Sequence, residues 1–205
     1  MTRIAVVDHG AGNLVSIARG LERSGADVVV VERGDEFANA DGVVLPGVGT
    51  TGAAMERLAA AALIDPLRDW DGPMLGICVG LQLFFDSSEE HGGTTGLGVM
   101  GGAVRKLESA PLLPHIGWND VATNGHPIFD GIPSGTPFYF VHSFAPEPAN
   151  PSVVIGTAEY GDRFVAAAAE GPRVGVQFHP ERSSGAGLRL LANFVAIAGA
   201  GARAA

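Results

Sequence analysis

The sequence contains a single cysteine, Cys78, among its 205 residues. One cysteine cannot form an intrachain disulfide, and without a second one, or a pair of histidines at ligand spacing, no structural metal site is expected. Basic residues are also few: 13 Lys and Arg stand against 22 Asp and Glu, for a net charge of -9. Because binding to DNA or RNA requires clustered positive charge, nucleic acid is not an expected partner. No apolar run approaches the roughly 20 residues that cross a bilayer, so no membrane span is expected either.

The remaining composition is that of a globular protein with an ample interior. Hydrophobic residues make up 46% of the chain and charged residues 17%, which is enough to bury one large core. We therefore expect a single domain over residues 1–205, with a frayed tail from about residue 200. The first residues lack the pattern of a secretory signal, so the cytoplasm is the expected compartment.

The first half of the chain alternates short apolar runs with helical patterns. The runs are β-branched and continuous, as in buried strands, and cover residues 3–7, 27–32, 42–47 and 73–77. One helix is expected between Asn13, as its N-cap, and Gly25, as its stop, and another over residues 53–63. This alternation predicts an α/β fold with a doubly wound, open, mostly parallel sheet and helices on both faces.

The second half is punctuated by Pro and Gly and changes character. Four strand-like segments follow closely: "FYFVHSF", "SVVIGTAEY", "RFVAAAAE" and "RVGVQF". They predict an antiparallel extension, so that the sheet as a whole is mixed. A final helix is expected near residues 186–198, and the polar segment 86–96 is expected to be a surface loop.

Cys78 lies in the pattern Gly76-Ile77-Cys78-Val79-Gly80, between a predicted buried strand and a helical stretch. A nucleophile elbow requires this context, because larger side chains would clash beside the reactive residue in a tight strand-to-helix turn. The N-terminus of a helix favours an anion and lowers the pKa of a thiol placed there. The alternative is an ordinary buried cysteine. The pattern favours a nucleophile.

A thiolate nucleophile needs a base, and the base needs a group that orients it. The segment "FHPERSS" offers His179 and Glu181 at the end of a predicted strand. Positions i and i+2 of an extended chain point to the same side, and catalytic groups of a doubly wound sheet gather at the carboxyl ends of strands. Taken singly, each could be an ordinary surface residue. Together with Cys78 they predict a Cys-His-Glu triad.

The segment "VVLPGVGTTG" can supply donors for the oxyanion that forms when a carbonyl is attacked. It ends a predicted strand with a glycine-rich loop whose backbone N–H groups, at Val48 and Gly49, can face a bound carbonyl. The N–H of Val79, directly after the predicted nucleophile, is the natural second donor. The alternative is a turn between a strand and a helix that has no chemical role.

In this order, "LPGVG", "GICVGLQ" and "FHPE" resemble the motifs of the class I, triad-type glutamine amidotransferases. The resemblance implies a flavodoxin-like fold and hydrolysis of glutamine to glutamate and ammonia through a thioester on Cys78. It implies that His179 protonates the leaving ammonia and then activates water, and that Glu181 orients His179. The substrate-binding residues that it implies are Gly47, Gln82, His142 and Ser143.

Three further blocks, "GAGNL", "PHIGWN" and "YFVHS", are similar to one subfamily in which the ammonia passes to a separate (β/α)8-barrel cyclase. The chain has no G-x-x-x-x-G-K-[ST] loop and no second domain to consume ammonia, so we expect a heterodimer and no cofactor. The resemblance implies a contact face for this partner that includes Asn13, Trp118, Asn119, Tyr139 and Arg182. For two of these residues an ordinary role is the alternative: core packing for Trp118 and a solvated charge for Arg182.

Three other interpretations are weighed against this one. "GAGNLV" after the first strand, with Glu32 further on, resembles a dinucleotide-binding fingerprint, but the third glycine is replaced by Val15. A peptidase-like or non-catalytic relative with the same cysteine elbow would lack "HPE" after the last strand, and this sequence has it. The glutaminases of pyridoxal phosphate and anthranilate synthesis lack the "PHIGWN" block.

Overall fold

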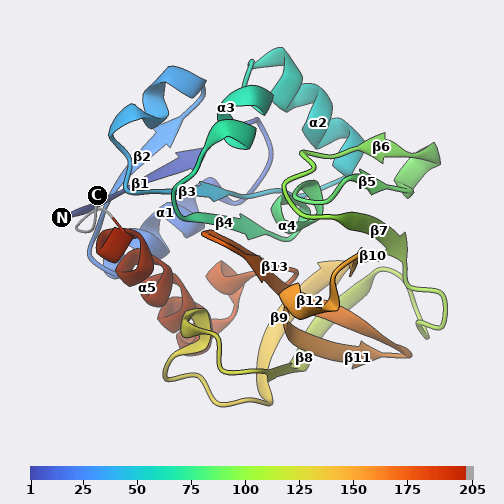
Figure 1. Cartoon of the computed structure of the whole chain (residues 1–205). Coiled ribbons are helices and arrows are strands. Elements are labelled where there is room, and N and C mark those ends of the chain that lie inside the picture. Colours follow the sequence, from blue (N-terminus) through green and yellow to red (C-terminus); the bar gives the residue numbers. More distant parts are fainter. Residues whose placement is uncertain (202–205) are drawn as a thin grey trace.

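The computed structural model describes residues 1–201, which form an α/β architecture around one large sheet (Figure 1). Within these residues, the strands of the large sheet follow the order β2-β1-β3-β4-β13-β12-β11-β8-β9. A second, smaller sheet has the order β10-β7-β5-β6. The predicted mixed α/β fold is confirmed.

The first part of the large sheet is parallel and forms the core of the fold. Its strands are β2 (Ala26–Val31), β1 (Thr2–Val7), β3 (Gly42–Leu45), β4 (Met74–Ile77) and β13 (Arg173–Val176). Both β3 and β4 are buried along their whole length. Their continuous apolar sequences follow from this, because a strand covered on both faces has no solvent side to carry polar residues.

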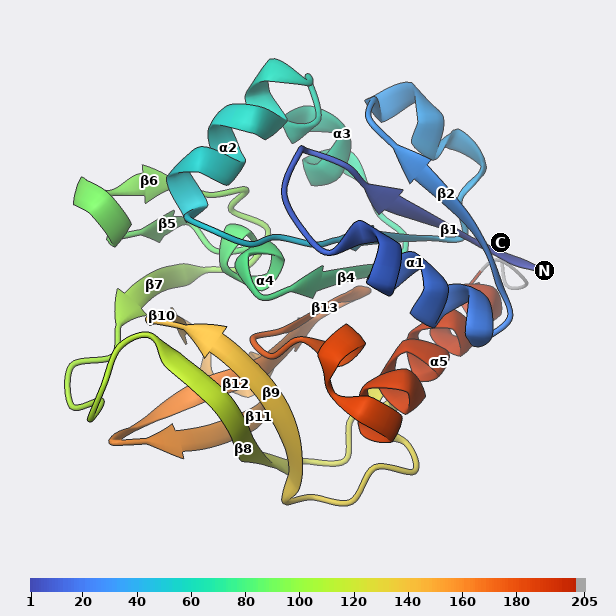
Figure 2. The same cartoon turned by 180° about the vertical axis from the view of Figure 1, so that it is seen from behind.

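Helices cover both faces of this parallel part, as predicted (Figures 1 and 2). One face carries α2 (Thr51–Ala60) and α3 (Ile64–Asp69), and the other carries α1 (Leu14–Arg23) and α5 (Ser184–Gly201). The short α4 (Val79–Leu83) directly follows β4. The 3-10 helices of the described residues are η1 (Gly34–Asn39), η2 (Glu90–Gly92), η3 (Pro127–Phe129), η4 (Pro151–Val153) and η5 (Pro180–Arg182).

The ends of two helices refine the sequence predictions. Gly25 lies just beyond α1 with a positive φ of 88°, as expected of a glycine stop, but Asn13 makes no side-chain capping hydrogen bond. The final helix is longer than predicted and continues to Gly201, so residue 200 and its neighbour are helical rather than frayed. The rest of the predicted tail, residues 202–205, lies outside the described residues.

The second part of the large sheet is antiparallel and consists of β12 (Asp162–Glu170), β11 (Val154–Tyr160), β8 (His115–Thr123) and β9 (Thr136–His142). The prediction for "RVGVQF" needs a correction. This segment, β13, is antiparallel to β12 but parallel to β4, so it joins the two parts of the sheet. Its partner β4 lies far away in the sequence, and local turn residues carry no information about that pairing.

The small sheet contains β10 (Phe144–Pro148), β7 (Gly102–Lys106), β5 (Ser87–Ser88) and β6 (Thr94–Thr95). The prediction of a surface loop over residues 86–96 is wrong in part, because this segment contributes both β5 and β6. These strands have two residues each, too short to produce an alternating pattern that sequence analysis can detect.

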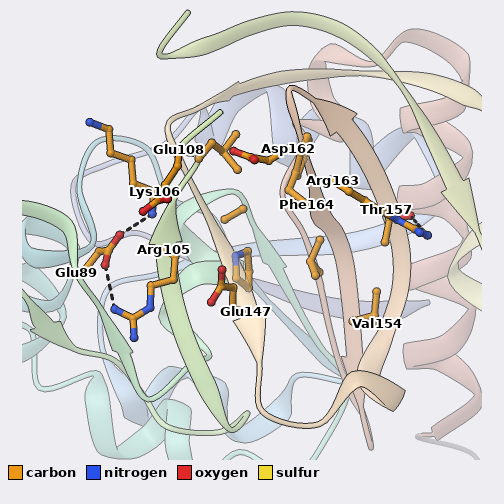
Figure 3. Close-up of a pocket in the computed structure, with 14 residues that line it drawn as sticks. Glu89, Arg105, Lys106, Glu108, Glu147, Val154, Thr157, Asp162, Arg163 and Phe164 are labelled. Atoms are coloured by element: carbon orange, nitrogen blue, oxygen red, sulfur yellow. Dashed lines mark hydrogen bonds and ion pairs between the residues drawn. The ribbon is translucent and has the colours of Figure 1, made fainter. Parts of the chain in front are cut away.

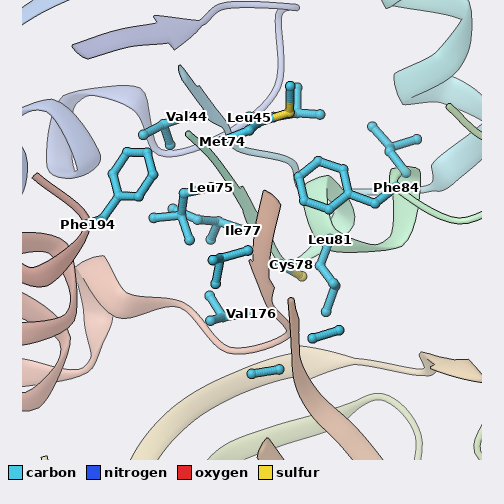
Figure 4. Packing of buried hydrophobic residues seen from close by; sticks show 14 of the residues in the cluster. Val44, Leu45, Met74, Leu75, Ile77, Cys78, Leu81, Phe84, Val176 and Phe194 are labelled. Atoms are coloured by element: carbon cyan, nitrogen blue, oxygen red, sulfur yellow. The ribbon is translucent and has the colours of Figure 1, made fainter. Parts of the chain in front are cut away.

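The core fills the space between the large sheet and its helices (Figure 4). Figure 4 shows Leu75 and Ile77 of β4 packed near Phe194 of α5 and Leu81 of α4, with the sulfur of Cys78 at the edge of this cluster. The packed strands hold the carboxyl ends of β4 and β13 in register, because Ile77 pairs with Val176. The residues that follow these two strands therefore meet at one edge of the sheet.

Candidate active site

Cys78 occupies a sharp turn between β4 and α4. Its φ of 55° and ψ of -107° lie in a region that side chains other than glycine rarely adopt. The flanking glycines are required by space: a Cβ on Gly80 would collide with the carbonyl oxygen of Leu45, and one on Gly76 would lie 2.7 Å from the Gly80 carbonyl. The turn therefore has the geometry of a nucleophile elbow.

His179 and Glu181 follow β13 and lie on the same side of the chain. The Nδ1 atom of His179 is 3.0 Å from Oε1 of Glu181, and their side chains are only 7% and 2% exposed. The backbone N–H of His179 donates to the carbonyl of Tyr139 on β9, at 2.8 Å. This arrangement fixes the imidazole ring, with its Nδ1 directed at the carboxylate.

The electrostatic environment of His179 favours its charged form. Burial alone would lower the pKa of this imidazole, but interactions with the side chains of Cys78 and Glu181 outweigh burial and raise the pKa to about 10. Because Nδ1 faces Glu181, the Nε2 atom remains for Cys78. The predicted triad residues are thus brought together, with a cationic imidazole between sulfur and carboxylate.

A cavity of about 310 Å³ opens onto Cys78 and His179. Most of the residues predicted for the oxyanion hole and for substrate binding line it, but Gly47 does not. Gly47 packs behind the cavity, where a Cβ would lie 2.8 Å from that of Val79. The lining residues are Val48, Gly49, Cys78, Val79, Gln82, Glu90, Pro114, Val141, His142, Ser143, Phe144, His179 and Arg182.

The predicted oxyanion donors come from two segments that line the cavity with Cys78. Val79 is the first residue of α4, and the first N–H groups of a helix have no partner within it. Val48 and Gly49 form an exposed loop between β3 and α2, and Gly49 has a positive φ of 91°. Thr50 caps α2 by accepting a hydrogen bond from the Ala53 N–H, which anchors the far end of this loop.

His142, at the end of β9, also lines the cavity and is held by two hydrogen bonds. Its Nδ1 lies 2.9 Å from the carbonyl oxygen of Phe144, and its Nε2 lies 3.0 Å from Nδ1 of His115. Because a carbonyl only accepts, the neutral His142 ring carries its proton on Nδ1 and accepts from His115 at Nε2. Burial is the main cause that lowers the pKa of His142 to about 4. This ring is therefore neutral at pH 7.

Glu90 and His115 are among the lining or supporting residues that sequence analysis missed. Glu90 begins η2, and its Oε2 accepts hydrogen bonds from the N–H and the hydroxyl of Thr51, at 2.8 and 3.2 Å. His115 is stacked on Tyr160, with ring centroids 4.0 Å apart, and supports His142 from behind. In the block "PHIGWN" the sequence analysis assigned a role to Trp118 and none to His115. Glu90 was missed because it lies in a segment predicted to be a surface loop.

Of the predicted partner-facing residues, Trp118 and Arg182 both pack on Tyr139, and Arg182 also lines the cavity. Trp118 is 52% exposed and packs edge-on against Tyr139, and the Arg182 guanidinium lies 4.3 Å above the Tyr139 ring. Asn119 instead donates to the Glu159 carbonyl. Asn13 is exposed at the start of α1, a helix that contacts η5. Core packing is therefore excluded for Trp118.

A larger cavity, of about 710 Å³, lies between the small sheet and the antiparallel strands (Figure 3). Its charged residues include one ion pair, between Arg105 and Glu89. Arg105 and the backbone N–H of Lys106 both bind the Glu89 carboxylate, at 2.9 and 2.7 Å. Figure 3 shows these interactions at one side of the cavity. It contains neither a cysteine nor a histidine, so we do not assign the chemistry to it.

Two negative findings concern the described part of the chain. Among residues 1–201, no group of three or more His, Cys, Asp or Glu side chains is arranged to hold a metal ion. None of the helices in the same residues combines the length and the apolar character needed to cross a membrane.

Comparison with known proteins identifies the family. Residues 5–198 match the family model described as glutamine amidotransferase class-I. The fold is similar to that of a glutamine amidotransferase from Thermotoga maritima, with a TM-score of 0.62 at 21% identity, covering 88% of this chain and 76% of that one. Another solved glutamine amidotransferase gives a TM-score of 0.75 at 18% identity, covering 95% and 98%. The chain belongs to the class-I glutamine amidotransferase family, and the dinucleotide-binding interpretation is set aside.

Curated relatives place the chain more narrowly. A protein from Moorella thermoacetica is 45% identical over 198 residues, covering 95% of this chain and 94% of the relative. One from Cyanothece sp. is 44% identical over 203 residues, covering 95% and 96%. Both are named imidazole glycerol phosphate synthase subunit HisH. Within the amidotransferases, this chain belongs to the HisH family.

Proposed function

We propose that this chain is the glutaminase subunit of an imidazole glycerol phosphate synthase, an enzyme of histidine biosynthesis. The observation that carries the proposal is the constellation at one edge of the sheet. Cys78 lies on a strained elbow, and His179, bonded to Glu181 at 3.0 Å, carries a positive charge beside it. These residues open onto a cavity of about 310 Å³, in a chain of the HisH family.

The first half of the reaction forms a thioester. The Cys78 sulfur, whose proton the cationic His179 already holds, attacks the side-chain amide carbon of glutamine, and the carbonyl oxygen becomes an oxyanion. The Val79 N–H and the loop of Val48 and Gly49 stabilise this oxyanion. A change in orientation of the Val48 peptide completes the hole. As the C–N bond breaks, the protonated His179 donates its proton to the leaving ammonia.

The second half regenerates the thiol. His179, now neutral, takes a proton from water, and the hydroxyl attacks the thioester carbon so that glutamate leaves and the sulfur is released. Glu181 stays ionised throughout, holding the ring with Nδ1 protonated and stabilising each cationic state of His179.

The cavity fits an amino acid with an uncharged side-chain amide. Glu90 and Arg182 both line it and carry opposite charges, which match the α-ammonium and α-carboxylate groups of glutamine. The amide of Gln82 provides a polar contact near the Cys78 end, with Ser143 beside it, and His142, whose two ring nitrogens are already bonded, holds this wall of the cavity in place. Gly47 acts indirectly, because its lack of a side chain allows the oxyanion loop to approach α4.

The ammonia is passed to a partner, a (β/α)8-barrel cyclase, in a heterodimer. Residues 1–201 belong to a single amidotransferase domain, and the cyclase uses the ammonia to make imidazole glycerol phosphate and an aminoimidazole carboxamide ribotide. The surface of Trp118, Tyr139 and Arg182, together with Asn13 and Asn119, forms the contact face. It includes an exposed indole and an arginine that both pack on Tyr139, residue types typical of binding hot spots. A catalytic thiol must stay reduced, which fits the cytoplasm.

Partner binding also gates the reaction in this proposal. Val48 is exposed at the mouth of the cavity, and Arg182 lines the same cavity while stacking on Tyr139. A cyclase bound to this face contacts both the loop of Val48 and Gly49 and the side chain of Arg182. We expect little glutamine hydrolysis by the isolated chain and strong activation in the complex.

The test is glutamate release from glutamine by the purified chain, alone and with the cyclase and its nucleotide ligand. Cys78→Ala is the matched control, because the chain has no other cysteine. Strong activation that disappears in the variant supports both the triad and the gating. Full activity without the cyclase overturns the gating alone, and activity that survives in Cys78→Ala overturns the proposed function.

A further inference from the structure

The chain contains only two glutamines, Gln82 and Gln177, and their side chains are hydrogen-bonded to each other next to the only cysteine. Gln82 lines the active-site cavity. Gln177 lies directly after β13, has no exposed surface and does not line that cavity. A fully buried amide that touches the nucleophile requires an explanation, because burying such a group is costly unless its hydrogen bonds are satisfied.

The contacts form a continuous chain from the backbone to the sulfur. The Nε2 atom of Gln82 is 3.0 Å from the carbonyl oxygen of Phe144 and 3.1 Å from Oε1 of Gln177. The Nε2 atom of Gln177 is 3.5 Å from Sγ of Cys78. Although Gln177 and Cys78 are 99 positions apart, the parallel pairing of β4 with β13 brings them together.

The direction of each amide follows from this chain of contacts. The Phe144 carbonyl can only accept, so Gln82 must turn its NH₂ group toward it. The second hydrogen of that NH₂ then faces Gln177, which must present its oxygen. The NH₂ group of Gln177 is consequently directed at the sulfur. A reversed Gln177 would place two NH₂ groups against each other and its oxygen against the sulfur.

We propose that Gln177 is a further catalytic residue, whose amide N–H donates a hydrogen bond to the ionised sulfur of Cys78 and stabilises it for attack on the substrate. The proposal rests on the proposed function and adds a residue to its chemistry. The proton itself leaves the sulfur for Nε2 of His179, and Gln177 neither gains nor loses one. Gln82 acts on the sulfur through Gln177, so it is a positioning residue in this respect.

The surroundings of the sulfur explain why such a donor is needed. The Cys78 thiol donates to the carbonyl oxygen of Val141, at 3.7 Å, in its neutral form. Once the proton has gone, that carbonyl dipole opposes the negative charge on sulfur. The amide N–H of Gln177 offsets this effect, and in a site shielded from water a fixed dipole acts strongly.

The test uses the single cysteine as its own reporter. We would measure the alkylation rate by iodoacetamide as a function of pH in the full chain, with Cys78→Ala as the blank. Two substitutions of nearly constant volume separate the roles of the amide. Gln177→Met removes the donor and keeps an unbranched side chain of similar size, and Gln177→Glu replaces the donor with a carboxylate oxygen.

The proposal predicts that the alkylation profile of Gln177→Met moves to higher pH by about one unit, with a rate at neutral pH lower by about tenfold. Gln177→Glu should shift it further in the same direction, because a carboxylate repels the sulfur anion. The kcat for glutamine should fall while KM changes little. Gln177→Met and Gln177→Glu profiles that coincide with the wild-type profile would overturn the proposal, whatever happens to the melting temperature.

A measurement on the unaltered protein covers the case in which the variants do not fold. Selective ¹⁵N labelling of glutamine gives two side-chain amide signals, one from each glutamine. The Gln177 amide protons should shift with pH in step with the ionisation of Cys78, followed by thiolate absorbance in the far ultraviolet. An amide signal insensitive to this ionisation would contradict the proposal.

Failure of this inference is distinguishable from failure of the proposed function. Alkylation and the amide signals report the sulfur without requiring turnover of glutamine. If glutamate release depends on Cys78 but the Gln177 variants leave the profile unchanged, only the role of Gln177 is lost.

Discussion

Two buried histidines from different elements line the active-site cavity, and the two rings have different charge states. On the side of β13 and η5, His179 is bonded to Glu181, and its pKa is raised to about 10. On the side of β9, His142 is bonded to His115 and to the Phe144 carbonyl, and its pKa is lowered to about 4. Both residues are about 5% exposed.

The comparison shows that hydrogen-bond partners, rather than depth of burial, decide which ring carries a charge. Burial disfavours the cation on both sides, and only His179 has a carboxylate and a sulfur to reverse that effect. The two rings therefore suit different tasks. His179 is an acid that can protonate ammonia. His142 is a neutral ring that fixes the segment after β9, where Ser143 and Phe144 line the cavity.

The largest effect is expected when the carboxylate of Glu181, which bonds to His179, is removed. Glu181→Gln removes the carboxylate but keeps the shape of the side chain, so the pKa of His179 should fall and its cationic form should be lost. We expect kcat for glutamate release in the presence of the cyclase to drop by about 10²- to 10⁴-fold. Steady-state kinetics would measure this.

The matched control for that substitution is Glu89→Gln. Glu89 binds Arg105 and the Lys106 backbone outside the cavity, so its removal should leave kcat unchanged. If Glu181→Gln and Glu89→Gln both stay close to wild type, the assigned role of the carboxylate is wrong.

The second prediction concerns stability against pH, where the two sides should act in opposite directions. The pKa of His142 is lower in the folded state, so the unfolded chain binds more protons below about pH 6.5, and stability is lost as the pH falls from about 6.5 to about 4. At about 1.4 kcal/mol per pH unit, this amounts to about 3 kcal/mol. His179 has a raised pKa, so its stabilisation is full below about pH 6.5 and is lost as the pH rises to about 10.

Urea unfolding at several pH values separates these two contributions. The free energy of unfolding of His142→Phe should decrease less than that of wild type as the pH falls below about 6.5. That of His179→Phe should decrease less than that of wild type as the pH rises above about 6.5. If the free energy of unfolding depends on pH in the same way in wild type and both variants, the two rings do not have opposite charge states.

The third prediction tests whether the His179 side is linked to the partner surface. Trp118 packs on Tyr139, whose carbonyl holds the His179 backbone. Trp118→Ala should weaken cyclase binding by about 2 kcal/mol, or about 30-fold in Kd, as is typical of a buried aromatic anchor. Val30→Ala serves as control in the binding titration, because Val30 is 47% exposed on β2, at the far end of the sheet. Equal affinities of the two variants would exclude Trp118 from the contact face.

The smallest effect is expected on the His142 side. His115→Phe keeps an aromatic ring against Tyr160 but removes the donor to Nε2 of His142, leaving a buried acceptor without a partner. We expect KM for glutamine to rise by about 3- to 10-fold, with a smaller change in kcat. His115→Gln, which retains an N–H donor, should recover part of the loss. An unchanged KM in His115→Phe would show that the ring is ordinary core.

The sequence was sufficient for the features that depend on local sterics and spacing. Gly76 and Gly80 predicted the elbow because no side chain fits beside the turn, and the spacing of His179 and Glu181 placed both on one side of an extended chain. The strands and helices of the first half were predictable for the same reason: each continuous apolar run or helical period is complete within a short segment.

The features that were missed depend on contacts between distant segments. Gln177 lies two positions before His179, but only the pairing of β4 with β13 reveals that it touches Cys78. His115 gains its importance from His142 on the neighbouring strand, through the register of β8 and β9. Glu90 is carried to the cavity by strands too short to be recognised in the sequence.

The central claim, that one cavity holds its two histidines in opposite charge states, is tested most directly by an NMR titration of histidine side chains in the free chain. His142→Phe and His179→Phe would assign the two sets of signals. We expect the His179 ring to stay protonated above about pH 8 and the His142 ring to stay neutral down to about pH 5. Titration of both rings near the ordinary histidine pKa of about 6.5 would contradict it.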